Sequence, residues 1–489
     1  MTNRYLAFDL GAESGRAILG QLNRGVLSIS EIHRFPNEPV RYGGGLHWDI
    51  ARLWLEMQRG FDRLGSGTLD SIGVDTWGCD YALVGERGHL LENPFSYRDS
   101  RTDGVMQEVN DRLGADTVYQ ATGIQFLAFN TLYQLYAAQR ATPRLIDAAQ
   151  SLATIPDLLN FWLTGRLQAE YTNATTTAMV DARARAWATD LLERLDLPTR
   201  LLLPLVEPGA VLGGLTAGVF GSHAGTPVIA PACHDTASAV ASVEAGGTNA
   251  FLSSGTWSLL GTELSSPIVS ARTRELNFTN EGGVCGTTRL LKNIGGLWLL
   301  QGCRRSWASI GQHYGYEDLL AAARDEPSAF RSLFDPDHRG FLHPDDMVAA
   351  IGLYCRQTGQ PEPTTPAAYV RAILESLAFK YRKVLESLEE LTGTRFEQIR
   401  IVGGGARNRL LNQFTANATG RPVIAGPIEA TALGNIAMQM MATGAVSSLR
   451  EAREVIDRSF PVERFQPSDA DRWDTPYQRF HEYVELTCV

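Results

Sequence analysis

Two segments about half a chain apart share one pattern, and this pattern constrains the fold more than any other feature of the sequence. In the first segment an apolar run ends at Leu10, small residues fill Gly11–Gly15, and a second apolar run starts at Ala17. In the second segment an apolar run starts at Asn249, meets Ser253–Thr256 and is followed by another apolar run. Both segments predict a strand–turn–strand hairpin with glycine or hydroxyl residues at the bend. The hairpins are either unrelated or the equivalent turns of two related lobes.

The second half of the chain predicts layers of helices and strands. Apolar residues recur at helical spacing over Ala367–Leu391, with Thr365 as the N-cap and Gly393 as the stop signal. This helix leads into a buried strand at Ile399–Val402, a turn at Gly403–Gly405 and a further helix. Strand, glycine turn and helix in this order are typical of an α/β layer. We therefore expect both lobes to be α/β.

The length of the chain, 489 residues, favours at least two domains. Glycines cluster after a predicted small-residue helix, in the segment from Glu244 to Thr248. We place the domain boundary there, which predicts an N-terminal lobe over residues 1–244 and a C-terminal lobe over residues 245–489.

Charge and cysteine usage exclude several classes of protein. The chain carries 44 Lys and Arg against 54 Asp and Glu residues, a formal net charge of −10, which argues against nucleic acid or an anionic membrane as a partner. The longest uncharged stretch, Ala430–Leu449, contains polar residues and predicts a buried core helix, not a membrane span. The six cysteines are scattered, so we expect free thiols, Cys355 included, in a reducing compartment. Because no apolar signal segment is visible at the N-terminus, we expect a cytoplasmic protein.

The motif that most often binds nucleotides is missing. A P-loop needs a lysine followed by serine or threonine, and the three lysines of this chain, Lys292, Lys380 and Lys383, precede Asn, Tyr and Val. The loops of protein kinases are absent as well. If the chain handles nucleotides, phosphates must be held by backbone amides, hydroxyl groups and a metal ion.

The glycine turns contain the groups that such binding needs. The amides of Gly11–Gly15, with Ser14 and Arg16, can wrap phosphate oxygens, because small residues let the backbone approach closely. Asp9 ends the preceding strand and can hold Mg²⁺ directly or through water. The three glycines of Gly403–Gly405 suit either a base or ribose lying against the backbone, or a close contact between helix and strand.

His234-Asp235-Thr236 stands where a predicted strand gives way to a helix. Asp235 has two interpretations, an N-cap of that helix or a general base that accepts a hydroxyl proton. His234 is by default a packed core histidine, and beside a candidate base it can contact a substrate hydroxyl.

These segments, taken together, resemble the FGGY carbohydrate kinases over nearly the full length of the chain. The motifs follow one another in the order of the family, and the combination is highly specific. They are Asp9-Leu10-Gly11-Ala12, Ser14-Gly15-Arg16, Gly73-Val74-Asp75-Thr76-Trp77-Gly78, Tyr97-Arg98-Asp99-Ser100-Arg101-Thr102, Gly123-Ile124-Gln125-Phe126-Leu127, Phe129-Asn130-Thr131-Leu132-Tyr133, Glu170-Tyr171-Thr172-Asn173-Ala174-Thr175-Thr176-Thr177, His234-Asp235-Thr236-Ala237-Ser238-Ala239-Val240, Ser253-Ser254-Gly255-Thr256-Trp257-Ser258-Leu259, Asn280-Glu281-Gly282-Gly283, Leu291-Lys292-Asn293-Ile294, Val402-Gly403-Gly404-Gly405 and Glu429-Ala430-Thr431-Ala432-Leu433-Gly434-Asn435.

The resemblance implies a fold and a set of site residues. The fold is the two-lobed, ribonuclease-H-like α/β fold of sugar kinases, actin and chaperone ATPases, with ATP and sugar in the cleft between the lobes. Asp235 is implied as the catalytic proton acceptor, and Asp9 as a ligand of Mg²⁺ through water. The implied sugar contacts are Gly78, His234, Asp235, Thr236 and Asn293. The implied ATP contacts are Ala12, Glu13, Ser14, Gly15, Arg16, Thr256, Gln301 and Gly404.

One residue departs from the family pattern. Glu13 occupies a place where the family usually has a small hydroxyl residue. A carboxylate in a phosphate loop repels phosphate unless it turns outward or meets the metal ion.

Within the family we expect L-rhamnulose as the acceptor, with MgATP as the phosphoryl donor and transfer to the C1 hydroxyl. Fuculose, xylulose and ribulose are the alternative ketoses. A second class of function is a non-catalytic sugar- or nucleotide-binding protein on the same fold. A third is an actin-like filament protein, but the sugar-site segments would have no purpose in such a protein. We expect a monomer or a weak homodimer.

Overall fold

The computed structural model describes residues 2–65, 67–342 and 344–487, and the chain forms two compact units. Each unit is assembled from three stretches of chain, because the chain passes from one unit to the other several times. The first unit comprises Met1–Glu244, Glu263–Leu290 and Glu429–Pro461, and the second comprises Ala245–Thr262, Leu291–Ile428 and Val462–Val489.

A six-stranded sheet forms the centre of the first unit, in the order β13-β14-β6-β1-β2-β3. The predicted hairpin is confirmed, since β1 and β2 pair antiparallel, and β1 also pairs parallel with β6. Asp9 on β1 stands directly opposite Asp75 on β6, near the carboxyl ends of both strands. The strands are β1 (Asn3–Leu10), β2 (Ser14–Asn23), β3 (Val26–Pro36), β6 (Ser71–Thr76), β13 (Val211–Gly214) and β14 (Pro227–Ile229).

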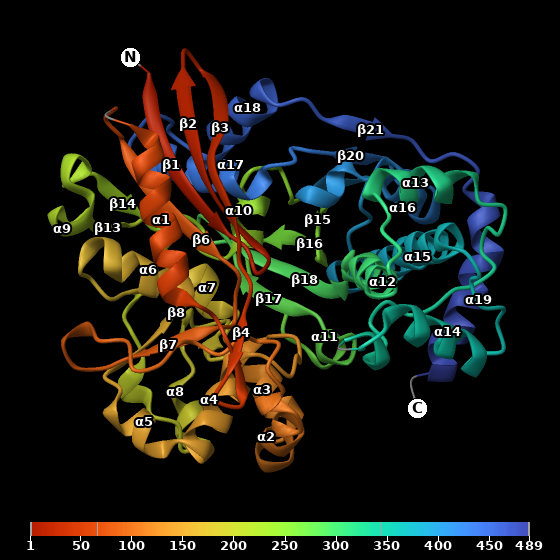
Figure 1. The fold of residues 1–489 in the computed structure, drawn as a ribbon, viewed down its shortest axis with the longest axis horizontal. Helices are drawn as coiled ribbons and strands as arrows, with labels where there is room; N and C mark the ends of the chain where they lie inside the picture. Colours follow the sequence, from red (N-terminus) through yellow and green to blue (C-terminus); the bar gives the residue numbers. More distant parts are fainter. Residues whose placement is uncertain (1, 66, 343, 488–489) are drawn as a thin grey trace. The chain divides into compact units, whose positions relative to one another are not determined.

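Helices cover both faces of this sheet. Successive residues of β1 point to opposite faces, so they pack into two different hydrophobic cores. Leu6, Phe8 and Leu10 join a hydrophobic core with α1 (Ile50–Leu64) and α6 (Ile155–Thr164). Tyr5 and Ala7 join a second core with α17 (Ala430–Ala442) and α18 (Leu449–Ser459). Figure 1 shows α1 and α17 beside these strands. The first unit is therefore a three-layer α/β/α arrangement.

Shorter elements complete the first unit. The remaining helices are α2 (Val105–Leu113), α3 (Ala115–Thr122), α4 (Thr131–Ala141), α5 (Pro143–Ala148), α7 (Tyr171–Thr175), α8 (Thr189–Arg194), α9 (Ala217–Phe220), α10 (Asp235–Ala241) and α11 (Ala271–Glu275). The remaining strands are β4 (Val40–Tyr42), β5 (Gly45–His47), β7 (Tyr81–Val84), β8 (Ser151–Thr154), β9 (Ala169–Glu170), β10 (Val180–Asp181), β11 (Ala186–Trp187), β12 (Leu205–Val206) and β17 (Thr279–Gly282).

The strands of the second unit lie in the order β18-β16-β15-β19-β20-β21. The second predicted hairpin is also confirmed, since β15 pairs antiparallel with β16 and parallel with β19. The strands are β15 (Asn249–Ser254), β16 (Trp257–Leu264), β18 (Thr288–Gly295), β19 (Gln398–Val402), β20 (Val423–Ala425) and β21 (Glu463–Phe465). The helices are α12 (Trp298–Ser309), α13 (Tyr316–Asp325), α14 (Met347–Gln357), α15 (Pro366–Thr392), α16 (Arg409–Thr419) and α19 (Asp471–Thr487).

Helix α15 has the ends that the sequence predicts. The Thr365 side chain accepts a hydrogen bond from the Ala368 amide, Pro366 is the first helical residue, and Gly393 is left-handed with φ 65°. Near its middle, the buried Lys380 ammonium lies 2.7 Å from Asp335 and 2.8 Å from Asp337.

One predicted helix is shorter than expected. The uncharged stretch from Ala430 to Leu449 predicts a single buried helix, but α17 ends at Ala442 and α18 begins only at Leu449. Gly444 has φ 73°, a left-handed conformation that ends a right-handed helix. Among the described residues, no helix combines the length and apolar character needed to cross a bilayer. Five cysteines are free thiols as expected, Cys355 among them, and Cys488 lies outside the described residues.

Candidate active site

The turn between β1 and β2 is held in a fixed shape by its own backbone and by Asn37. The Gly11 amide donates to the Ser14 carbonyl at 3.0 Å, and the Asn37 side chain donates to the Gly11 carbonyl at 2.8 Å. A Cβ at Gly15 would lie 2.2 Å from the ring of Phe35, so only glycine fits there. The predicted phosphate turn, Ala12–Arg16, is thus preorganised.

Glu13 is the exposed residue of this turn. Its carboxylate is 40% exposed and lies 3.7 Å from the guanidinium of Arg98. A positive partner on the neighbouring Tyr97–Thr102 segment therefore offsets the charge that a phosphate would otherwise meet.

Arg16 connects the turn to two carboxylates. Its guanidinium contacts Asp9 through one nitrogen and Glu429, at the start of α17, through another. The Arg16 fork is therefore engaged within the first unit, where it fixes the position of the Asp9 side chain.

Asp9 and Asp75 form a pair of buried carboxylates at the ends of adjacent strands. Asn435 donates to one oxygen of Asp75 at 2.6 Å, whereas the other oxygen, Oδ1, is buried and has no hydrogen-bond partner among the described residues. Burial raises the pKa of both carboxyls; Arg16 opposes this at Asp9, and the charge of Asp235 raises the pKa of each. Three acidic groups thus lie within electrostatic reach of one another.

This arrangement suits a magnesium ion that arrives with its nucleotide. Within the described residues, no three His, Cys, Asp or Glu side chains are close enough to share a metal ion. Mg²⁺ in phosphoryl-transfer sites is typically held by phosphates, water and only one or two carboxylates. The crowded carboxylates of Asp9 and Asp75, one with an unpaired oxygen, fit that donor set.

Asp235 is brought to this region by the pairing of two chain segments. The Thr76 amide at the end of β6 donates to the Cys233 carbonyl at 2.9 Å, and Thr76 forms a parallel bridge with His234. Helix α10 begins at the next residue. Asp235 therefore directly follows the segment that pairs with the end of β6, the strand that carries Asp75.

The N-cap interpretation of Asp235 is wrong. His234 occupies the cap position, and Asp235 is the first residue of the helix proper. Its Oδ1 accepts hydrogen bonds from the Thr236 amide at 2.5 Å and the Thr236 hydroxyl at 3.1 Å, and lies 3.4 Å from His234 Nε2. All contacts that the described residues make with this carboxylate go to Oδ1. The Asp235 side chain is 31% exposed, so a ligand can reach this carboxylate.

A buried acid, Glu170, supports the segment before Asp235, a role that sequence reasoning does not assign. Its carboxylate accepts hydrogen bonds from the Thr172 amide at 2.9 Å and, from Asn173 and Cys233, at 3.0 and 3.1 Å. Burial raises the pKa of Glu170 to about 7 despite these donors. The only signal for it in the sequence is its place in the motif Glu170–Thr177.

Gly78 lies in a loop with no room for a side chain. A Cβ there would be 2.8–3.0 Å from three side-chain atoms of Thr176, whose hydroxyl accepts a hydrogen bond from the Cys79 amide at 3.0 Å. Two residues further along, Asp80 accepts from the indoles of Trp48 and Trp77 at 2.6 and 2.9 Å. These contacts fix the path of the backbone at Gly78.

In the second unit, the turn between β15 and β16 is attached to a helix start. The Gly255 amide donates to the Trp257 carbonyl at 2.9 Å, and the amides of Leu297 and Trp298 donate to the carbonyls of Gly255 and Thr256 at 3.0 and 3.1 Å. The first amides of α12 are therefore used to hold the predicted phosphate turn.

The glycine turn after β19 makes the close contact that one of its two interpretations predicts. A Cβ at Gly403 or Gly405 would lie within 3.0 Å of Ser254, so these two residues make the close contact. Gly404 between them is exposed, and a methyl group added there would have nothing within 4 Å. Gln301, one turn into α12, has a buried Oε1 without a hydrogen-bond partner among the described residues.

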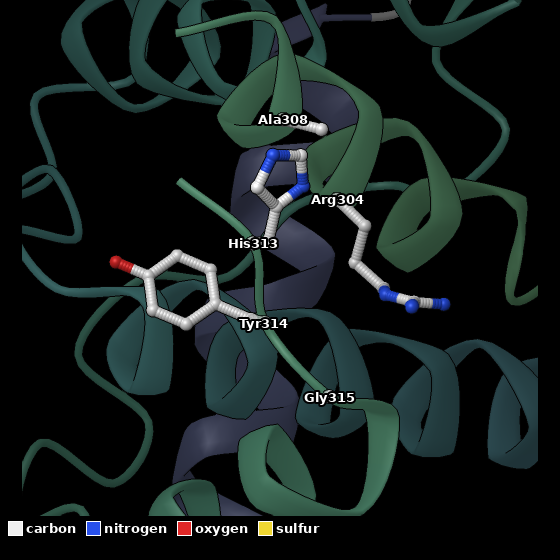
Figure 2. Close-up of a pocket in the computed structure, with 5 residues that line it drawn as sticks. All are labelled: Arg304, Ala308, His313, Tyr314 and Gly315. Carbon is white, nitrogen blue, oxygen red and sulfur yellow. The ribbon is translucent and has the colours of Figure 1, made fainter. Parts of the chain in front are cut away.

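A small pocket lies further along α12. It has a volume of about 280 Å³ and is lined by Arg304, Ala308, His313, Tyr314 and Gly315. In Figure 2 the ring of His313 points toward Ala308, while that of Tyr314 points to the other side of the segment. None of the residues predicted from the sequence lines this pocket.

Comparison with known proteins decides the family. The N-terminal domain of the FGGY family of carbohydrate kinases matches residues 4–242, and the C-terminal domain of the same family matches residues 250–443. This chain is an FGGY carbohydrate kinase. It has the two-domain α/β fold of the family, and it belongs to the ATP-dependent sugar kinases, which use Mg²⁺.

Curated relatives within the FGGY family align over nearly the whole chain. A rhamnulokinase from Bacteroides thetaiotaomicron is 44% identical, covering 99% of this chain and 100% of that protein. A rhamnulokinase from Pectobacterium atrosepticum is 43% identical, covering 97% and 95%.

Solved structures of FGGY-type kinases share the fold. A ligand-bound xylulose kinase from Lactobacillus acidophilus superposes with a TM-score of 0.82 at 17% identity, covering 98% of this chain and 97% of that one. Glycerol kinase from Plasmodium falciparum with ADP gives a TM-score of 0.79 at 16% identity, covering 100% and 99%.

The predicted site residues of this FGGY kinase divide between the two units. The first unit brings together the β1–β2 turn, the carboxylates and the His234–Thr236 segment. It contains Asp9, Ala12, Glu13, Ser14, Gly15, Arg16, Gly78, His234, Asp235 and Thr236. The second contains Thr256, Asn293, Gln301 and Gly404.

Substitution of Gly78 by alanine is expected to raise the KM for the sugar at least about tenfold, because the new methyl must displace Thr176 or the loop. The KM for ATP is expected to stay within about twofold of the wild type. Steady-state kinetics with each substrate varied in turn measures both values.

Gly405→Ala is the matched control, since its methyl would meet Ser254 in the second unit. Its expected effect is the reverse, a higher KM for ATP and an unchanged KM for the sugar. If both substitutions change the KM for the sugar and the KM for ATP equally, this would contradict the expectation that Gly78 lies near the sugar and the Gly403–Gly405 turn near the nucleotide.

Proposed function

We propose that the protein transfers the γ-phosphoryl group of MgATP to the C1 hydroxyl of L-rhamnulose, giving L-rhamnulose 1-phosphate and ADP, in L-rhamnose catabolism. The rhamnulokinases at 40–44% identity over almost the full length support this acceptor. The observation that carries the proposal is Asp235, a partly exposed carboxylate within electrostatic reach of the Asp9 and Asp75 carboxylates at the ends of their strands.

In the proposed reaction, Oδ2 of Asp235 accepts the proton of the C1 hydroxyl as that oxygen attacks the γ-phosphorus in line with the leaving ADP. A positioned base contributes about 10²–10⁴-fold to such a step. Thr236 holds Oδ1 through its amide and hydroxyl, so the base keeps one orientation. Most of the remaining catalysis of phosphoryl transfer is positioning and charge neutralisation.

The backbone amides of the two turns are the proposed phosphate ligands. Residues Ala12–Arg16 and Thr256 would contact phosphate oxygens, and Gly404 with Gln301 would contact the adenosine moiety. Mg²⁺, when bound with the nucleotide, would neutralise charge on the phosphate oxygens, with Asp9 as its protein ligand through water. Glu13, paired with Arg98, would contribute its backbone and not its carboxylate.

The same proposal assigns the sugar contacts and the domains. Gly78, His234, Asp235 and Thr236 would bind the sugar, together with Asn293. We propose residues 1–244 as the domain of sugar binding and proton transfer, and residues 245–489 as the domain of adenosine binding. We further propose a cytoplasmic enzyme that is a monomer or a weak homodimer, which light scattering on a sizing column measures.

Incubation of the purified protein with MgATP and L-rhamnulose is expected to release ADP and to form a sugar phosphorylated on carbon 1. A coupled ADP assay measures turnover, and phosphorus–carbon coupling in NMR spectra identifies the phosphorylated carbon. A panel of fuculose, xylulose and ribulose under the same conditions tests the other ketoses. Faster turnover of one of these would contradict L-rhamnulose as the acceptor, and sugar binding without ADP release would indicate a non-catalytic binding protein.

A further inference from the structure

A buried ion pair lies behind the imidazole of His234, on the side away from Asp235. Arg289, near the start of β18 and in the first unit, is 0% exposed, and its Nη2 lies 3.1 Å from Glu281 on β17. The Arg289 Nε donates to the Gly282 carbonyl at 2.8 Å. Its third nitrogen, Nη1, is buried without a hydrogen-bond partner among the described residues.

Stability alone does not favour such a pair. Transferring two charges into the interior costs more than their attraction returns unless every polar atom is satisfied, and replacing such pairs by neutral side chains is often harmless to stability. Here one guanidinium nitrogen is unsatisfied by any described residue. Burial tends to raise the pKa of Glu281, but the charges of and hydrogen bonds from Arg289 and His234 together keep its pKa below the ordinary value. The pair thus stays ionic beside the candidate base.

The contacts of His234 form a directed series. Arg289 Nη2 lies 3.3 Å from Nδ1 of the imidazole, and the opposite nitrogen, Nε2, lies 3.4 Å from Oδ1 of Asp235. A guanidinium only donates hydrogen bonds, so Arg289 is matched at Nδ1 by the tautomer that carries its proton on Nε2, whereas Oε2 of Glu281, also 3.3 Å from Nδ1, is matched by the other tautomer. In the Nε2–H tautomer, that N–H lies on the side of Oδ1 of Asp235, the oxygen that Thr236 already holds. Glu281 also pairs with Arg289 at 3.1 Å, which keeps the guanidinium at the imidazole.

We propose that Glu281 and Arg289 are positioning residues that hold His234 as its Nε2–H tautomer, so that His234 fixes Oδ1 of Asp235 and directs Oδ2 at the sugar hydroxyl. The inference rests on the proposed function, because it assigns a purpose to residues that act through the general base. Without Arg289, Glu281 would instead accept a hydrogen bond from Nδ1–H, and Nε2 would turn a lone pair toward Oδ1.

The test replaces the ion pair by neutral side chains of similar size, Glu281→Gln together with Arg289→Met. Since both charges are removed, the thermal unfolding temperature is expected to change little. The kcat for L-rhamnulose is expected to fall by up to about 100-fold, as for other small displacements of a catalytic group, while the KM for ATP stays within about twofold. In a His234→Ala background the same pair replacement is expected to change kcat less than about twofold, because the two act through one path.

The matched control is a second, partly buried Arg–Glu pair of the first unit. Arg453 lies 2.7 Å from Glu263 and binds the carbonyls of Val240 and Ala241 at the far end of α10. The double variant Glu263→Gln with Arg453→Met undergoes the same chemical change and is expected to keep its kcat.

An unchanged kcat in the Glu281 and Arg289 double variant would overturn the proposal, as would an equal loss in the presence and absence of His234. If the double variant does not fold, Arg289→Lys, which keeps the charge but loses the fork, is expected to show the same loss of kcat. Assays of the wild type distinguish failure of the proposed function from failure of the positioning role. If the wild type turns over no ketose, the proposed function is contradicted. If the wild type is active and the Glu281 and Arg289 double variant has the same kcat, only the positioning role is contradicted.

Discussion

Asp235→Asn is expected to lower kcat by about 10²–10⁴-fold and to leave folding unchanged. The amide oxygen of asparagine can still accept the hydrogen bond from Thr236, but the second position carries an NH₂ group that cannot take a proton. Because His234 and not Asp235 occupies the N-cap position of α10, the helix loses no capping group. Turnover by a coupled ADP assay and thermal unfolding by circular dichroism measure the two effects.

Asp49→Asn serves as the control for this substitution. Asp49 is an exposed N-cap of α1 whose side chain accepts a hydrogen bond from the Arg52 amide, and asparagine caps helices equally well. Its kcat and stability are expected to match the wild type. Turnover of Asp235→Asn within a few-fold of the wild type would refute its role as the base, and loss of folded protein would show a structural role instead.

Gly434→Ala is expected to destabilise the first unit severely. Gly434 lies on α17 where this helix packs on α10, and an added Cβ would be 1.7 Å from the backbone carbonyl oxygen of Ser238. Alanine normally stabilises a helix relative to glycine by about 1 kcal/mol. Overpacking costs about 1–3 kcal/mol or more, and here the clash is with backbone, so the two helices must separate. Since α10 begins at Asp235, activity is expected to fall with stability.

Gly218→Ala provides the comparison on an open surface. Gly218 is exposed on α9, and nothing lies within 4 Å of a methyl group added there. The free energy of unfolding from urea titrations is expected to be unchanged or slightly higher for this variant. A Gly434→Ala protein as stable as Gly218→Ala would show that the contact between α10 and α17 is far looser than the structure indicates.

The local elements could be predicted from the sequence because their signals are local. Both hairpins, the long helix with Thr365 and Gly393 at its ends, and the strand before Gly403–Gly405 all stand where the pattern of apolar and turn residues places them. The length of α17 could not be predicted, because its uncharged sequence continues past the left-handed Gly444 without a change in composition. The N-cap of α10 is His234, one residue before the Asp235 that the sequence suggests. His234 forms a β-bridge with Thr76, so the helix can start only after it.

The polar partners of the site could be predicted only in part. The motif order identifies Asp235 and the turns, but it gives no role to Glu429, which contacts Arg16 from more than 400 positions away. In the sequence, Glu281 is visible only as part of a motif, and Arg289 is not visible at all. Their contacts with His234 depend on how strands distant in the sequence are brought together. Such partners follow from tertiary structure and not from spacing.

The lysine side chains have an unusual distribution. All three, Lys292, Lys380 and Lys383, lie in the second unit, and Lys380 is buried between Asp335 and Asp337. Reagents that attack side-chain amines, such as succinimidyl ester dyes, would therefore mark one unit and leave the side chains of the other unlabelled. An endoproteinase specific for lysine can likewise cut only within the second unit, so digestion with and without ATP reports opening of that unit alone.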